Sequence, residues 1–159
     1  MPRVDLTAVF SPEQFERALK SWTWLGLDGK QPGFTSRFGD VFFQSADGVW
    51  RLDHLEGTLT RHWLTLDAMR AELNTPRGQD DYLLGGLAMS AERAGLSLGP
   101  GEIYVFEVPP ILGGPIAVDA ITTIDFVVGL HLLGQIHEQV STLPPGTSIS
   151  GITVDGDKP

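Results

Sequence analysis

The sequence predicts a single α+β domain in which an antiparallel β-meander packs against several helices. Between residues 40 and 63, three short apolar runs alternate with two turn signals, Asp47-Gly48 and Glu56-Gly57, which is typical of strands joined by hairpins. On both sides of that region, apolar residues recur at helical spacing. The chain has 159 residues, of which 42% are hydrophobic and 19% charged, so it can bury a core and has a globular composition.

We expect one compact domain made of three segments along the chain. Residues 1–37 supply an N-terminal helix and a loop, residues 38–154 form the main α+β unit against which they pack, and residues 155–159 form a tail. The predicted elements, in chain order, are a helix over 12–21, a loop over 27–33, strands over 40–44, 49–54 and 58–63, a helix over 66–73, a helix from 76 to 94, a strand over 102–108 and an edge strand over 150–154.

Particular residues set the ends of these elements. The first helix begins at a capping box, with Ser11 at the N-cap and Gln14 three residues later. The helix from residue 76 ends at Gly95, which suits the position just beyond a helix C-terminus. Residues 121–143 are ambiguous, because apolar residues at helical spacing coincide with the β-prone run Phe126-Val127-Val128. We favour a helix that covers at least residues 130–142.

The charge distribution limits the classes of partner. The formal net charge is −9, and no Lys or Arg lies between Arg93 and Lys158. Such a field repels nucleic acid and anionic membranes and attracts a basic partner, although ordinary solubility explains an acidic balance as well. The chain has no cysteine, no apolar run of the roughly 18 residues that a membrane helix needs, and no secretory signal pattern. We therefore expect a cytoplasmic protein.

The motifs contain no catalytic or metal-binding constellation. The four histidines lack zinc-ligand spacing, although His54 and His62 flank a turn and could approach one another. The pair Gly99-x-Gly101 lacks the third glycine and the following helix of a phosphate-binding loop. Residues 146–151 resemble the Gly-x-Ser-x-Gly motif of a nucleophile elbow, but their second glycine comes one residue too late. We predict no catalytic residue, no cofactor and no metal, and therefore no enzyme.

Three groups of motifs, in this order, resemble one bacterial family. They are Phe38-Gly39-Asp40-Val41-Phe42-Phe43 with Gly48-Val49-Trp50-Arg51-Leu52-Asp53, then Leu98-Gly99-Pro100-Gly101-Glu102-Ile103-Tyr104-Val105-Phe106 with Pro109-Pro110-Ile111-Leu112-Gly113-Gly114, and finally Gly134-Gln135-Ile136-His137-Glu138-Gln139 with Leu143-Pro144-Pro145-Gly146-Thr147. From about Phe38 to Val154 the chain resembles the C-terminal domain of type VI secretion DNase-immunity proteins, the Tdi family. Members often carry a preceding domain called GAD-like, and the short stretch before Phe38 leads us to expect that this domain is absent here.

The resemblance implies a cytoplasmic, non-enzymatic protein that binds a cognate toxin, usually a nuclease, and blocks its active site. The acidic balance supports this hypothesis, because a nuclease presents Lys and Arg to phosphates and an anionic surface can mimic them. The residues that we expect to contact the toxin are Asp80, Asp81, Asp119, Asp125 and Glu138. We expect no direct contact with nucleic acid or membrane. The alternative is a cytoplasmic binding module for a small molecule or cellular protein, with the aromatic-rich strands between residues 40 and 63 as its pocket.

Overall fold

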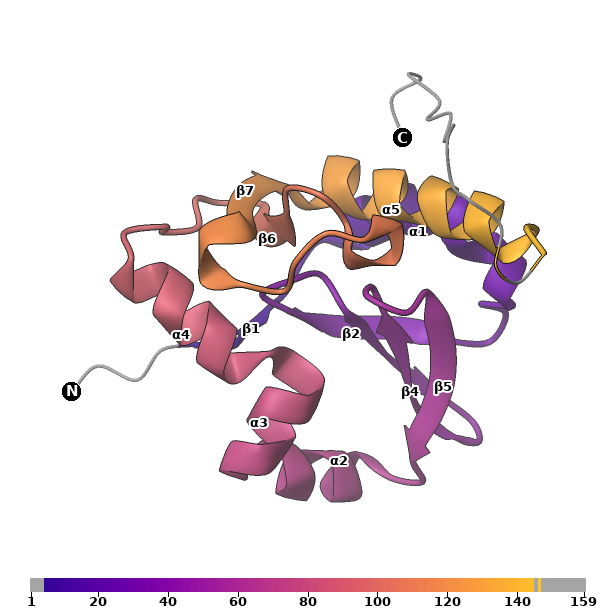
Figure 1. The fold of residues 1–159 in the computed structure, drawn as a ribbon. Helices are drawn as coiled ribbons and strands as arrows, with labels where there is room; N and C mark the ends of the chain where they lie inside the picture. Colours follow the sequence, from indigo (N-terminus) through magenta and orange to yellow (C-terminus); the bar gives the residue numbers. More distant parts are fainter. Residues whose placement is uncertain (1–4, 145, 147–159) are drawn as a thin grey trace.

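A meander of five antiparallel strands forms the middle layer of the molecule (Figure 1). In the computed structural model, which describes residues 5–144 and 146, these strands lie in the sheet in chain order. They are β1 (Thr7–Ala8), β2 (Gln31–Ser36), β3 (Val41–Ser45), β4 (Gly48–Asp53) and β5 (Thr58–Trp63). Ser45 pairs with Gly48, so a two-residue turn joins β3 to β4 at the predicted Asp-Gly signal.

Helices cover both faces of this sheet, and a separate two-stranded ribbon lies beside the upper helices (Figure 1). The α-helices are α1 (Pro12–Leu19), α2 (Leu66–Leu73), α3 (Pro76–Leu83), α4 (Gly85–Arg93) and α5 (Phe126–Ser141); the ribbon pairs β6 (Glu102–Phe106) with β7 (Ile121–Asp125); and short 3-10 helices are η1 (Lys20–Leu25), η2 (Pro110–Leu112) and η3 (Val118–Ala120). The predicted single α+β domain with an antiparallel meander is confirmed. In the described part of the chain, every helix is too short or too polar to cross a membrane.

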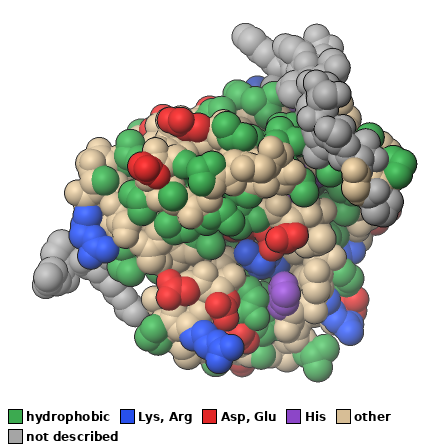
Figure 2. All heavy atoms as spheres, in the orientation of Figure 1, with side chains coloured by type: hydrophobic (Ala, Val, Ile, Leu, Met, Phe, Trp, Pro, Cys, Tyr) green, Lys and Arg blue, Asp and Glu red, His purple; other side chains and the backbone are tan. Residues whose placement is uncertain are grey.

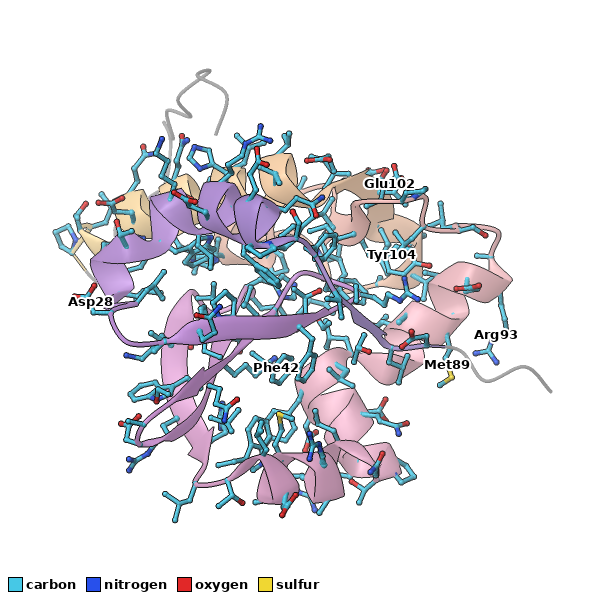
Figure 3. The ribbon with its side chains drawn as sticks, turned by 180° about the vertical axis from the view of Figure 1, so that it is seen from behind. Asp28, Phe42, Met89, Arg93, Glu102 and Tyr104 are labelled. Atoms are coloured by element: carbon cyan, nitrogen blue, oxygen red, sulfur yellow. The ribbon has the colours of Figure 1, made fainter. Side chains whose placement is uncertain are left out.

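Side-chain alternation along β3 builds a separate core on each face of the sheet. Val41 and Phe43 are buried beneath α1 and α5. Phe42, which lies between them in the sequence, points to the opposite face and packs with Trp63 and Met69 (Figure 3). The meander therefore holds two helical layers apart, one made of α1 and α5 and the other of α2 and α3.

A third core lies between the ribbon and α4. Phe38, just before β3, packs with Tyr104 and Phe106 of β6 and with two small residues of α4, Ala88 and Ala91. The ring centroids of Phe38 and Phe106 are 5.5 Å apart and nearly parallel. Tyr104 and Phe106 thus attach the ribbon both to the meander and to α4.

Helix α5 packs unusually closely against the segment that follows α1. The indole N–H of Trp22 donates to the carbonyl oxygen of Leu130 at 2.8 Å, and Trp22 is fully buried. Gly134 makes this approach possible, because a Cβ atom there would lie only 2.1 Å from the hydroxyl oxygen of Ser21. Glycine at this position serves packing, although it lowers helix propensity by about 1 kcal/mol.

The first helix confirms its predicted capping box, whereas the predicted loop over 27–33 is partly wrong. The Ser11 hydroxyl accepts the backbone N–H of Gln14, and the Gln14 side chain accepts the backbone N–H of Ser11. Strand β2, however, begins inside the predicted loop and includes Pro32. Because β1 pairs only with Thr35 and Ser36, Pro32 lies on the outermost strand at that point, where a proline is tolerated.

The predicted helix from 76 to 94 is wrong as one continuous helix. Leu84 interrupts it with a φ of 51°, and the chain resumes as α4. The side chain of Asp80 accepts the backbone N–H of Gly86 at 2.9 Å, so a residue of α3 caps the next helix. The predicted end is confirmed, since Gly95 has a φ of 93°.

Residues 121–143 contain both a strand and a helix. Strand β7 ends at Asp125, whose carboxylate accepts the backbone N–H of Val128 at 3.0 Å and caps α5. The β-prone run that starts at Phe126 is therefore helical, because the N-cap and burial against α1 outweigh its local preference. The predicted edge strand over 150–154 and the tail over 155–159 lie outside the described residues.

Candidate partner-binding surface

A buried polar network ties the loop before β3 to the end of β4. Asp40 is fully buried at its centre. The carboxylate of Asp40 accepts hydrogen bonds from the Ser36 hydroxyl at 2.8 Å and from the His54 backbone N–H at 2.9 Å, and its Oδ1 lies 2.6 Å from His54 Nδ1. A buried charge needs such partners, so this network serves the fold first.

The same network contains a group of possible metal ligands. Oxygen and nitrogen atoms of Asp40, Asp53 and His54 lie within 4.8 Å of one another. Arg51 already supplies a positive charge there: its guanidinium lies 3.3 Å from Asp53 and 3.7 Å from Asp40, and its side chain is only 8% exposed. Because a cation would have to displace a buried guanidinium, we assign these residues a structural role.

The electrostatics of Asp40 agree with that role. Burial alone raises the pKa of its carboxyl group, but the charge and hydrogen bonds of His54, with the charge of Arg51, outweigh burial and lower the pKa to about 2. Asp40 is therefore ionised throughout the neutral range. A carboxylate in this state neither gives nor takes a proton near pH 7, which is what acid-base catalysis would require.

The network reaches α5 through His137. The Nε2 atom of His137 donates to the backbone carbonyl oxygen of His54 at 2.7 Å. Burial lowers the pKa of His137, and this hydrogen bond offsets part of the effect. A cavity of about 20 Å³ between His54, His137 and Pro109 has room for a water-sized molecule, far less than an organic substrate needs.

Three of the five carboxylates expected at the toxin interface have structural partners in the fold. Asp80 caps α4, as described above. Asp81 lies 3.6 Å from Arg77, one turn earlier in α3, and Asp125 is the N-cap of α5. Their charges are therefore partly used within the chain, which the sequence pattern did not reveal.

The other two carboxylates, those of Asp119 in η3 and Glu138 in α5, are exposed and have no hydrogen-bond or ion-pair partner among the described residues. The five predicted residues do not converge on one place, because they lie on α3, on η3 and at both ends of α5. Figure 2 shows acidic side chains above and below a band of hydrophobic side chains on this face. The acidic character is thus spread over the surface.

A groove of about 670 Å³ lies between the sheet edge at β1–β2 and the helices α2–α4, and sequence reasoning missed it. Its walls include apolar side chains from separate elements, among them Leu6, Phe34, Met69 and Met89 (Met89 is labelled in Figure 3). The aromatic pocket expected in the meander is not formed by β3, since Phe42 and Phe43 are both 1% exposed.

The comparisons with known proteins agree with the motif pattern. A family model described as T6SS immunity protein Tdi1, C-terminal, matches residues 66–137, from α2 into α5. Among solved structures, the crystal structure of Atu4351 from Agrobacterium tumefaciens is similar, with a TM-score of 0.53 and 18% sequence identity over 82% of this chain and 66% of that chain. At that identity the likeness shows the fold alone. No curated protein matches the chain.

The family match covers the central motif block and part of the last one, whereas the motifs from Phe38 to Asp53 lie before it. It supports an immunity-protein role, and an immunity protein implies a cognate toxin as its partner. The resemblance that the motifs indicated is thereby confirmed. Over residues 66–137 this chain matches the family model described as T6SS immunity protein Tdi1, C-terminal.

Proposed function

We propose that this protein binds a cognate secreted toxin and neutralises it by masking a basic active-site surface, the toxin being a nuclease. The family match over residues 66–137 carries the immunity role. The nuclease target rests on charge: the chain has a net charge of −9 and no Lys or Arg between Arg93 and Lys158. A nuclease attracts phosphates with Lys and Arg, and an acidic protein surface competes for the same groups.

The exposed carboxylates support this mechanism unequally. Asp119 and Glu138 are free within the described part of the chain and can each pair with a toxin cation at no cost to the fold. Asp81 would first have to leave Arg77, although an exposed ion pair of this kind is weak. Asp80 and Asp125 would have to contact the toxin while their carboxylates also bond backbone N–H groups at helix starts. We therefore rank Asp119 and Glu138 first among the contacts.

We further propose that the protein is non-enzymatic and acts in the bacterial cytoplasm. The buried network around Asp40 agrees with a structural role for these residues, because the Asp40 carboxylate is ionised and inaccessible. An inhibitor of this kind works by occupying the toxin and needs only a rigid surface of suitable charge and shape.

The test is a DNA-cleavage assay with the purified toxin encoded beside this gene. Addition of this protein at a one-to-one ratio should stop cleavage, and the inhibition should weaken as salt is raised, because screening reduces charge-charge attraction. Bovine serum albumin, also acidic, serves as the control for unspecific charge effects. Cleavage that continues at a stoichiometric excess of this protein would refute the proposal.

The groove beside β1 favours a second function, a binding module for a small apolar molecule. Its volume of about 670 Å³ and its mostly apolar walls are in the range of ligand pockets. Native mass spectrometry of the purified protein distinguishes the two functions. A bound molecule of constant mass, lost when Met89, which lines the groove and is 37% exposed, is replaced by Trp, would favour the binding module.

A further inference from the structure

The segment from Glu107 to Ala120, here called the corner loop, connects the two strands of the ribbon and is folded back on itself. The backbone N–H groups of Leu112 and Gly114 both donate to the carbonyl oxygen of Pro109, at 2.8 and 3.2 Å. Gly114 approaches Val108 so closely that a Cβ atom on it would lie 1.8 Å from the Val108 carbonyl oxygen. The two prolines and two glycines of the family motif therefore set one shape for this loop.

The loop is also held in place by the rest of the molecule. The backbone N–H of Glu107 donates to the carbonyl oxygen of Ala120 at 2.8 Å, which extends the pairing of β6 with β7. Pro109, Pro110 and Ile111 line the small cavity together with two buried histidines, His54 just after β4 and His137 of α5. A surface that is ordered before binding loses less entropy when it docks.

This well-held loop exposes two large apolar side chains. Val108 is 49% exposed and Ile116 is 53% exposed. Both residues belong to the same closed loop, because Gly114, two residues before Ile116, touches the backbone of Val108. The loop crosses the front of the molecule in Figure 1, and Figure 2 shows hydrophobic side chains gathered over the same part of that face.

Two exposed carboxylates lie beside these apolar residues. Glu107 precedes Val108, and Asp119 neighbours Ala120, whose carbonyl oxygen is bonded to Glu107. Neither carboxylate has a partner among the described residues. The loop itself contains no Lys or Arg. Arg37 lies against β6, where its backbone carbonyl oxygen accepts the Tyr104 N–H, but its side chain is engaged with Asp5. Apolar contacts surrounded by charge of one sign are the usual arrangement of a protein interface for a partner of opposite charge.

We propose that the corner loop is the surface with which this protein docks on its toxin, and that the toxin presents Lys or Arg side chains around an apolar patch. Val108 and Ile116 fill the apolar centre of the interface, and Glu107 and Asp119 pair with the surrounding cations. The inference rests on the proposed function and adds the location and chemistry of the contact.

The acidic helix α3 fits such a partner less well. Its Asp81 is paired with Arg77, and its Asp80 is bonded to the backbone of α4. Two other strongly exposed apolar residues, Val9 at 76% and Leu64 at 74%, lie in separate connections, after β1 and between β5 and α2. Single exposed apolar residues are common on any protein surface, so these two residues provide matched controls.

The experiment measures the dissociation constant for the purified toxin encoded beside this gene, by calorimetry, for the wild type and four double variants. The apolar pair Val108→Ser/Ile116→Ser is compared with Val9→Ser/Leu64→Ser. The charge pair Glu107→Lys/Asp119→Lys is compared with Glu16→Lys/Asp28→Lys, which makes the same change of charge at exposed positions elsewhere. Thermal melts of all variants verify that each one folds.

Each corner-loop pair should weaken binding at least about tenfold, and each control pair should stay within about threefold of the wild type. The charge pair should also reduce the dependence of binding on salt more than its control does. If the wild type binds the toxin and the corner-loop pairs bind as their controls do, the loop is not the docking surface and the proposed function stands. If the wild type does not bind, the proposed function itself fails.

Hydrogen exchange of the wild-type complex gives an answer without any variant. Protection should appear over residues 107–120 when the toxin is added. Protection confined to α2–α4 would overturn the inference and would point to the groove beside β1 instead.

Discussion

The Nδ1 atom of His54 lies 2.6 Å from the Oδ1 atom of Asp40, and both side chains are buried, at 4% and 0% exposure. Asp40 belongs to the loop that enters β3, and His54 follows β4. Through His54 the contact continues to His137 of α5. One ionised carboxylate thus joins the meander to the upper helical layer, which makes Asp40 the first position to test.

Replacing Asp40 by Asn should destabilise the protein by about 3 kcal/mol, because the buried guanidinium of Arg51 and the ring of His54 lose their shared negative partner. Urea unfolding followed by circular dichroism measures the change. Asp67→Asn is the matched control, since its carboxylate is 95% exposed in its pair with Arg70, and we expect no measurable loss there. Equal stability of the two variants would show that the network is not needed.

The wild type should lose stability in acid through Asp40. Its folded-state pKa of about 2 lies below the ordinary value of 3.8, so the stabilisation is complete above pH 3.8 and is lost as the pH falls through about 2. The difference corresponds to about 2 kcal/mol. Urea titrations between pH 5 and pH 2 should show a steeper loss for the wild type than for Asp40→Asn. Parallel curves would contradict the assignment.

His137 should give a second pH dependence, at higher pH. Burial lowers its pKa below the ordinary 6.5, against the hydrogen bond to His54 and the charges of Asp53 and Glu56, which raise it. The folded state therefore disfavours the protonated ring, so stability is complete above pH 6.5 and falls below it. His137→Gln keeps a side-chain donor but does not titrate. Its unfolding midpoint should change less between pH 7.5 and 5.5 than that of the wild type.

The close packing of α5 on η1 predicts opposite effects for two helical glycines. Gly134→Ala should cost about 2 to 3 kcal/mol, because the new methyl group would meet Ser21 at 2.1 Å. Gly86→Ala meets only the Asp80 carboxylate, at 3.3 Å, and should be neutral or stabilising by up to about 1 kcal/mol. Thermal unfolding compares the two variants. A stable Gly134→Ala protein would show that the helices can move apart at little cost.

Asp125 allows its cap role to be separated from its charge. Asp125→Ala should cost about 1 kcal/mol of stability, because the Val128 N–H at the start of α5 loses its acceptor, whereas Asp125→Asn should keep the cap. Asp119→Ala should leave the melting temperature unchanged, since its carboxylate has no partner among the described residues. If both Asp125 variants destabilise equally, its charge matters more than its hydrogen bond.

Local signals predicted most of the elements but not their interruptions. The Asp-Gly turn, the capping box at Ser11 and the glycine at position 95 each act through neighbouring residues, and all three are confirmed. The break at Leu84 depends on Asp80 bonding across two helices. Strand β1 is only two residues long and is a strand only because it pairs with β2. Such features leave no periodic pattern in the sequence.

For the candidate site, the sequence by itself determined the family resemblance, the overall acidity and the Pro109-Pro110 and Gly113-Gly114 pairs, because motifs and charge are properties of the chain before it folds. Only the tertiary structure decided which carboxylates have partners among residues 5–144. Asp80, Asp81 and Asp125 look alike in the sequence to Asp119, but hydrogen bonds and an ion pair occupy them once the helices are placed. The tertiary structure also decided that the corner loop is well held and exposes Val108 and Ile116, since exposure depends on what packs nearby.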